Sequence, residues 1–214
     1  MKGIICLGEA LIDFIPLDRE NTTYQKSPGG APANVAVGVA RLGAKSTFLG
    51  KVGSDVLGGF LYNTLANHGV QVNAMKLSNE AKTGLVFVTN DENGERSFSF
   101  FIDKSADFYL NEADIEEQLF KENKLLHFGS ISLIDEPARS ATKKAVQLAK
   151  ENGLLCSYDP NLRLGLWKSE RDAKEMIVSM LFEADVLKIS EEELTFITGE
   201  SEIEKGLQKL DDYQ

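Results

Sequence analysis

The chain has 214 residues, 43% of them hydrophobic, which suits one globular domain or one domain with a small appendage. Lys and Arg total 23 against 33 Asp and Glu, and the formal net charge of −10 argues against broad binding to nucleic acids or anionic membranes. Both cysteines lie in apolar runs, so we expect buried free thiols. The N-terminus shows no signal-peptide cleavage site, and we expect a cytoplasmic protein.

Strand and helix patterns alternate along most of the chain. In the first half they predict a buried strand and loop over 3–14, a helix over 31–42, a strand over 46–53, a helix over 55–68 and a β-hairpin over 83–102. In the second half they predict a strand and loop over 124–133, a helix over 136–151, a strand over 153–161, a helix over 169–182, a strand over 184–190 and helices over 191–198 and 201–210.

Repeated strand–helix units are typical of an α/β fold with a mostly parallel central sheet and helices on both faces. The hairpin interrupts this rhythm. Asn93-Gly94 is expected in its turn, and Phe98 and Phe100 alternate with serines in its second arm, so one face of that arm is apolar. We therefore expect the hairpin to form a small separate sheet, with the segment 14–26 as a further strand.

In open sheets of this kind, ligands bind outside the carboxyl ends of the strands. Polar residues that follow the predicted strands are therefore the candidates for a site: Asp13, Ser54, Asp55, Ser130, Ser132, Asp159, Asn161, Arg163, Lys188, Ser190 and Glu193. Asp55 and Ser190 are equally expected as helix N-caps. The sequence contains neither G-x-x-x-x-G-K-[ST] nor G-x-G-x-x-G, so any nucleotide would be bound by another route.

The run GGAPANVAVGVARLGAKSTFLGKVG (29–53) resembles the N-terminal signature of the ribokinase-like (PfkB-type) carbohydrate kinase family. The matching positions are Gly29, Gly30, Asn34, Gly43 and Gly53. GEALIDF, VGSDVLG, DPNLR and LKISEEE resemble further segments of the family, so the resemblance extends essentially from end to end. Within the family, the chain is most similar to fructokinases, with 2-keto-3-deoxygluconate kinases close behind.

The resemblance implies a ribokinase-like fold, in which the hairpin and 14–26 form a lid over the sugar. It also implies transfer of the γ-phosphoryl group of ATP to a primary hydroxyl of fructose, with magnesium (Mg2+) as cofactor. The residues that would bind the sugar are Asp13, Gly29, Gly30, Asn34, Asp159 and Asn161. Arg163 and Lys188 would stabilise phosphate charge, Lys188 and Glu193 would serve the nucleotide side, and Glu193 would organise Mg2+ through water. Such lids often pair between subunits, so a homodimer is expected.

Two alternatives stay open. Arg163 can instead pair with the carboxylate of a sugar acid, as a 2-keto-3-deoxygluconate kinase would require. The family's C-terminal G-A-G-D motif, which carries the general base, does not occur in the sequence, and GESE at 199–202 does not match it. We therefore expect residues 1–214 to be the N-terminal part of one kinase domain whose nucleotide-binding part lies beyond them. If the chain ends there, the alternative is a sugar-binding module without catalysis.

Overall fold

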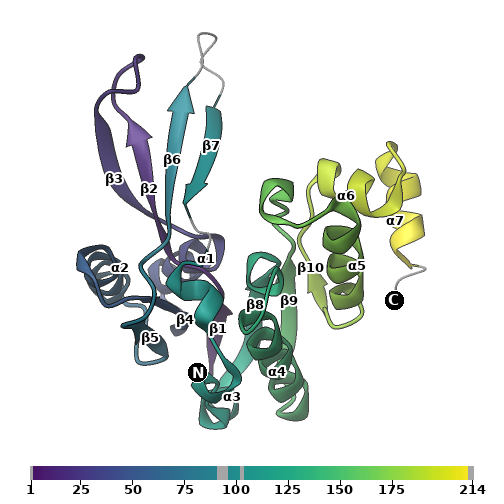
Figure 1. Ribbon diagram of the computed structural model, residues 1–214. Coiled ribbons are helices and arrows are strands. Elements are labelled where there is room, and N and C mark those ends of the chain that lie inside the picture. The colour runs from purple at the N-terminus through teal and green to yellow at the C-terminus, as the bar shows by residue number, and fades with distance from the viewer. Residues whose placement is uncertain (1, 91–95, 102–103, 212–214) are drawn as a thin grey trace.

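The computed structural model describes residues 2–90, 96–101 and 104–211, and it contains two sheets (Figure 1). The larger sheet has six strands in the order β10-β9-β8-β1-β4-β5, and neighbouring strands run parallel. Its strands are β1 (Gly3–Leu7), β4 (Ser46–Gly53), β5 (Met75–Ser78), β8 (Asn123–Gly129), β9 (Leu155–Asp159) and β10 (Val186–Leu187). The expected parallel central sheet is therefore confirmed.

Side chains alternate between the two faces of this sheet, and each face packs into its own hydrophobic cluster. Ile5 and Leu7 of β1 pack into the larger cluster with α3, α4, α5 and α6, whereas Cys6 packs on the opposite face with α1 and α2. The helices are α1 (Ala31–Arg41), α2 (Val56–Asn67), α3 (Glu117–Glu122), α4 (Ala138–Glu151), α5 (Glu170–Leu181), α6 (Glu191–Thr198) and α7 (Ile203–Asp211). The short 3-10 helices are η1 (Ala106–Tyr109), η2 (Glu112–Asp114), η3 (Ile131–Leu133) and η4 (Leu164–Leu166). Helices thus cover both faces, as the strand–helix alternation predicts.

The second sheet has the order β3-β2-β6-β7, and we call it the lid sheet. Its strands are β2 (Leu11–Pro16), β3 (Tyr24–Gly29), β6 (Leu85–Asn90) and β7 (Arg96–Phe101). It projects from one end of the central sheet (Figure 1). The expected small separate sheet is confirmed, although its first strand begins at Leu11, before the expected start of the segment 14–26. The expected Asn93-Gly94 turn lies outside the described residues.

The prediction for residues 3–14 is wrong in how the chain connects the two sheets. The apolar run 3–14 was expected to be one strand of the central sheet followed by a loop, but it divides into β1 and β2, which belong to different sheets. The division falls at Gly8, whose φ of 145° lies outside the range that other residues readily adopt. Asp13 therefore lies within a strand of the lid sheet and not at the carboxyl end of a central strand.

Most other sequence expectations agree with the structure. The strand over 46–53 matches β4, and the predicted helices match α1, α2 and α4 to α7 within a few residues. The short elements β5 and α3 were not predicted. Both cysteines are free and buried, as expected. Along the part of the chain that the structure describes, no helix combines the length and the apolar character needed to cross a membrane.

Candidate functional site

The glycine pair Gly29 and Gly30 lies where the chain leaves the lid sheet and enters α1. A Cβ on Gly29 would lie 2.3 Å from Oδ2 of Asp13, and a Cβ on Gly30 would lie 2.4 Å from the carbonyl oxygen of Glu9. Gly30 also has a φ of 104°, which strongly favours glycine. Both glycines are thus required by close contact with neighbouring segments of the chain itself, whether or not a sugar approaches them.

Asp13 is half-buried on the lid sheet, and its carboxylate lies against Gly29. It pairs across the sheet with Ser27 and Val86, and Val86 in turn pairs with Phe100, so these side chains share one face of the lid sheet. Partial burial raises the pKa of Asp13. Among the described residues the Asp13 carboxylate has no hydrogen-bond or ion-pair partner, so both oxygens are available to accept from ligand hydroxyl groups.

Asn34 lies in the first turn of α1, where its backbone N–H donates to the carbonyl of Gly30 at 2.9 Å. Its side chain is exposed and, with Gly29, lines a groove of about 260 Å³ between α1 and α2. Helical side chains tilt toward the N-terminus of their helix, so the Asn34 amide leans toward the glycine pair. Gly29 lies against the Asp13 carboxylate and lines the same groove as Asn34, whereas Asp13 does not line that groove.

A second group of predicted residues gathers at the carboxyl ends of β9 and β10. The Nζ of Lys188 lies 3.2 Å from Oδ2 of Asp159, and the backbone N–H of Asn161 donates to Oδ1 of Asp159 at 3.2 Å. Asn161 has a φ of 45°, a conformation that asparagine tolerates better than most residues. Lys188 is 63% exposed, so its ammonium can leave this ion pair for a phosphate group.

Glu193 is buried at the start of α6. Its Oε2 accepts from the backbone N–H of Ser190 at 2.9 Å, and the Ser190 hydroxyl accepts from the N–H of Glu193, which completes a capping box. Its Oε1 accepts from the N–H of Leu162 at 2.7 Å. Glu193 therefore ties α6 to the loop that follows β9, and Ser190 is the helix N-cap that the sequence allowed.

The Glu193 carboxylate can serve magnesium through a metal-bound water. No three His, Cys, Asp or Glu side chains are grouped as a metal site in the described ranges 2–90, 96–101 and 104–211. Each Glu193 oxygen accepts one backbone hydrogen bond and keeps a lone pair, to which a metal-bound water can donate.

Arg163 belongs to the same loop and is exposed. Its guanidinium donates to the carbonyl of Leu162 at 3.0 Å. Burial raises the pKa of Glu9, a residue outside both predicted groups, and the positive charge of Arg163 opposes that shift.

Two acidic residues near the base of the lid sheet were not anticipated. Glu9 is 3% exposed, and its Oε1 accepts from the backbone N–H of Ala31 at 2.9 Å. Burial raises its pKa to about 7, although the Ala31 hydrogen bond opposes the shift. Asp107 of η1 accepts from the Ser105 hydroxyl at 2.5 Å, and burial raises its pKa to about 6. The sequence offered a signal for Glu9, because it is an acidic residue inside the apolar run 3–14. No sequence pattern marked Asp107 as a residue of the site.

Comparison with known proteins places this arrangement in a family. Residues 1–213 match the pfkB family carbohydrate kinase. The chain is 49% identical to Probable fructokinase-7 of Arabidopsis thaliana over 201 residues, which are 92% of this chain and 59% of that protein. It is 48% identical to Fructokinase-2 of Solanum lycopersicum over 206 residues, 94% of this chain and 63% of that protein. The chain thus spans less than two thirds of the length of these relatives.

Solved structures with a similar fold lead to the same family. The apo fructokinase of Vibrio cholerae O395 superposes with a TM-score of 0.90 at 40% identity and covers 100% of this chain, which covers 72% of that one. A double mutant of that enzyme, bound to fructose, ADP and potassium, superposes with a TM-score of 0.90 at 41% identity over 100% of this chain and 68% of that one. The Xylella fastidiosa fructokinase with bound ATP has a TM-score of 0.90 at 34% identity, over 98% of this chain and 65% of that one. Fold, motif positions and relatives agree, and the chain belongs to the pfkB family of carbohydrate kinases.

Proposed function

We propose that this chain forms the sugar-binding part of an ATP-dependent fructokinase. The observation that carries the proposal is the half-buried Asp13 carboxylate, which lies against Gly29 at the base of the lid sheet without a protein partner among the described residues. A sugar carries many hydroxyl groups and little charge, so it is held by directed hydrogen bonds. Asp13 can accept two of them, and the Asn34 amide can both donate and accept. Asp159 and Asn161 complete the proposed sugar contacts.

The phosphoryl group would meet the cations on the opposite side of the site. Arg163 and Lys188 would stabilise its charge, and Glu193 would hold Mg2+ through water, with ATP as the phosphoryl donor. Mg2+ supplies charge neutralisation at the phosphates when it is bound. The solved relatives with ATP, or with fructose and ADP, support the nucleotide and the sugar as ligands of this chain.

We further propose that the general base and the adenine contacts lie in the part of the relatives that this chain does not match. On β9 and β10, Leu155 is 52% exposed and Val186 is 49% exposed, and the pairing of Val186 with Ser157 puts both side chains on one sheet face. An additional segment that covers this face would bury both of them. The 1–214 unit would then be the N-terminal part of a single kinase domain.

Two further proposals concern the oligomeric state and the cellular location of the protein. An exposed aromatic side chain on the lid sheet supports a homodimer formed through the lid, since Phe101 is 61% exposed and packs edge-on against Phe87, which stacks on Phe14. Two free, buried thiols support a cytoplasmic location, because reducing compartments keep cysteines unpaired.

Calorimetry tests the sugar assignment directly on this chain. We expect fructose to bind, and 2-keto-3-deoxygluconate to bind more weakly. A longer protein that includes the G-A-G-D segment should phosphorylate fructose with ATP and magnesium. A clear preference for the keto-acid, lost in Arg163→Ala, would replace fructokinase by the sugar-acid kinase. Absence of binding to either sugar would overturn the proposed site.

A further inference from the structure

Two of the passages that connect the lid sheet to the rest of the chain touch each other. Residues 8–10 lead from β1 to β2, and residues 29–31 lead from β3 to α1 (Figure 1). A Cβ on Gly8 would lie 2.6 Å from Cγ of Pro32, and a Cβ on Gly30 would lie 2.4 Å from the Glu9 carbonyl. The two passages are therefore closely packed, through the Pro32 ring at one contact and through the Glu9 backbone at the other.

One side chain fastens these passages together. The Glu9 carboxylate accepts from the first N–H of α1, that of Ala31, at 2.9 Å. This N–H has no partner within the helix, and the partial positive charge of the helix N-terminus favours a carboxylate there. Through this contact Glu9 fixes the Gly29–Gly30 turn, which lies against the Asp13 carboxylate and accepts a hydrogen bond from the backbone N–H of Asn34.

Retaining a carboxyl at this position is costly. Glu9 is 3% exposed, and the residues beside it on the two passages, Gly8, Ala10, Gly30, Ala31 and Pro32, carry no charge. Two charged groups on other elements act on it. Asp107 of η1 raises its pKa, and Arg163 of the loop after β9 lowers it, so the ionised form is sensitive to charge in the site. A neutral side chain would remove this penalty, so the buried acid is a candidate for a functional role.

We propose that Glu9 is a positioning residue for the sugar, whose ionised carboxylate holds the first turn of α1 and the glycine pair in the geometry that binds fructose. This inference rests on the proposed function. Glu9 does not touch the sugar; it acts through Ala31 and the glycine turn. Hydrogen bonds to an ionised acceptor are roughly twice as strong as neutral ones, so protonation of Glu9 should loosen the turn without unfolding it.

The test is fructose affinity, measured by calorimetry on the 214-residue chain between pH 6 and pH 8.5. Wild-type affinity should fall as the pH drops below about 7, because Glu9 becomes protonated. Glu9→Gln keeps an acceptor oxygen but cannot ionise. The fructose affinity of this variant should be about threefold weaker than that of the wild type at pH 8, and it should not change with pH. Glu9→Ala removes the acceptor and should weaken binding about tenfold. Asp107→Asn should move the wild-type midpoint to lower pH, because it removes a neighbouring negative charge.

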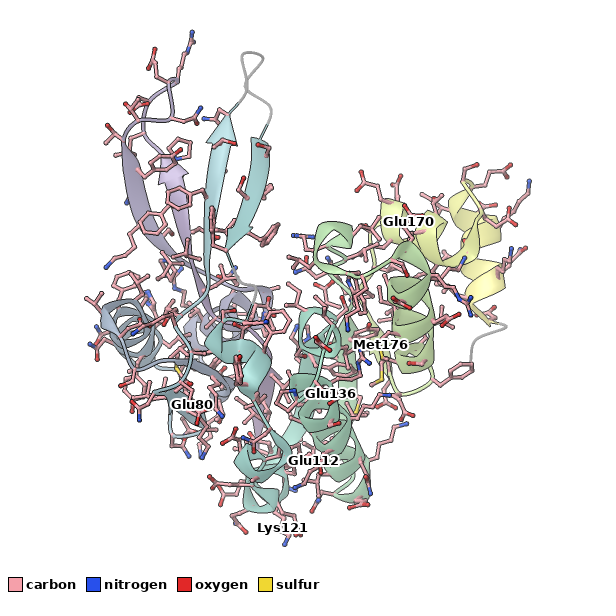
Figure 2. All side chains as sticks on the ribbon, viewed as in Figure 1. Glu80, Glu112, Lys121, Glu136, Glu170 and Met176 are labelled. Atoms are coloured by element: carbon pink, nitrogen blue, oxygen red, sulfur yellow. The ribbon has the colours of Figure 1, made fainter. Side chains whose placement is uncertain are left out.

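Controls separate the possible failures. Glu112→Gln replaces an exposed glutamate near α3, away from the lid sheet in Figure 2, and should leave both affinity and pH profile unchanged. If Glu9→Gln retains the wild-type pH profile, another group such as Asp13 controls binding and the inference is wrong. If the wild-type chain binds no fructose at any pH, the proposed function itself fails. Circular dichroism on each variant checks that the fold persists, and a folded Glu9→Ala with wild-type affinity also overturns the inference.

Discussion

At the scale of single residues, the proposed site residues differ in whether the fold supplies them with a protein partner. The Asp13 carboxylate is half-buried and lies against Gly29 without a hydrogen-bond donor among the described residues. Glu193 is the opposite case, because both of its oxygens already accept from backbone N–H groups. Asp13 is thus suited to bind a ligand directly, whereas Glu193 is suited to hold structure and to act through water.

Replacing Asp13 by alanine should remove the main hydrogen-bond acceptor for the sugar. We expect Asp13→Ala to lose about 2–4 kcal/mol of fructose binding, as for a pair of hydrogen bonds to a charged group. Calorimetry on the chain, or kcat/KM in a longer active protein, measures this loss. Asp172→Ala, at an exposed acid of α5, is the matched control. Near wild-type affinity in Asp13→Ala would remove Asp13 from the site.

At the scale of elements, the loop after β9 is held in place by α6. The capping box between Ser190 and Glu193 begins the helix, and the second oxygen of Glu193 reaches the backbone of Leu162 in the loop. Arg163 follows directly in that loop, and Asp159 and Asn161 precede it. The position of these predicted site residues thus depends on a contact between segments that lie 31 residues apart.

Removing the Glu193 carboxylate should therefore destabilise both the helix and the loop. Glu193→Ala leaves the N–H groups of Leu162 and Ser190 without their acceptor, and we expect a loss of about 2 kcal/mol in the free energy of unfolding. Urea denaturation followed by circular dichroism measures it. Glu192→Ala, an exposed neighbour in the same helical turn, should change stability by less than about 0.5 kcal/mol. Equal effects from both substitutions would contradict the role given to Glu193.

At the scale of the whole molecule, two layers of helices enclose the central sheet, and the lid sheet is attached at one end (Figure 1). Glu9 and Asp107 lie near this attachment, and burial raises the pKa of both carboxyls. A raised pKa means that the folded state binds the proton more tightly than the unfolded chain does. Each group therefore contributes stability at low pH that is lost as the pH rises through its window.

The window for Glu9 runs from the ordinary value of 4.5 to about 7, so its contribution to stability should decline as the pH rises from 5 to 7. The contribution of His127 to stability changes in the opposite direction in part of this range. Burial lowers the pKa of His127, so its contribution grows as the pH rises. The informative quantity is therefore the difference in Tm between wild type and Glu9→Gln, followed by calorimetry from pH 5 to pH 8. This difference should grow in favour of Glu9→Gln as the pH rises. A difference that does not change with pH would show that Glu9 does not titrate in this range.

Much of the fold was predictable because its signals are local. Helix α1 follows from an apolar run that ends before Gly43, and strand β7 of the lid sheet follows from phenylalanines that alternate with serines. A sugar site that includes Asp13, Gly29 and Asn34 was expected only from the resemblance to the family. The 3–14 run was misread because a continuous apolar stretch does not show where a chain changes sheets.

What the sequence by itself determined was the fold class and the family, since these depend on periodicity and short motifs; the residues that would meet the sugar stay a prediction. Only the tertiary structure placed Asp13 in the lid sheet and joined Glu9 to Ala31 across 22 residues. It alone also showed that the two glycines are required by contacts within the chain. The physical reason is that hydrogen bonds and close backbone approaches between distant segments depend on how the two sheets are connected, and no local pattern encodes that connection.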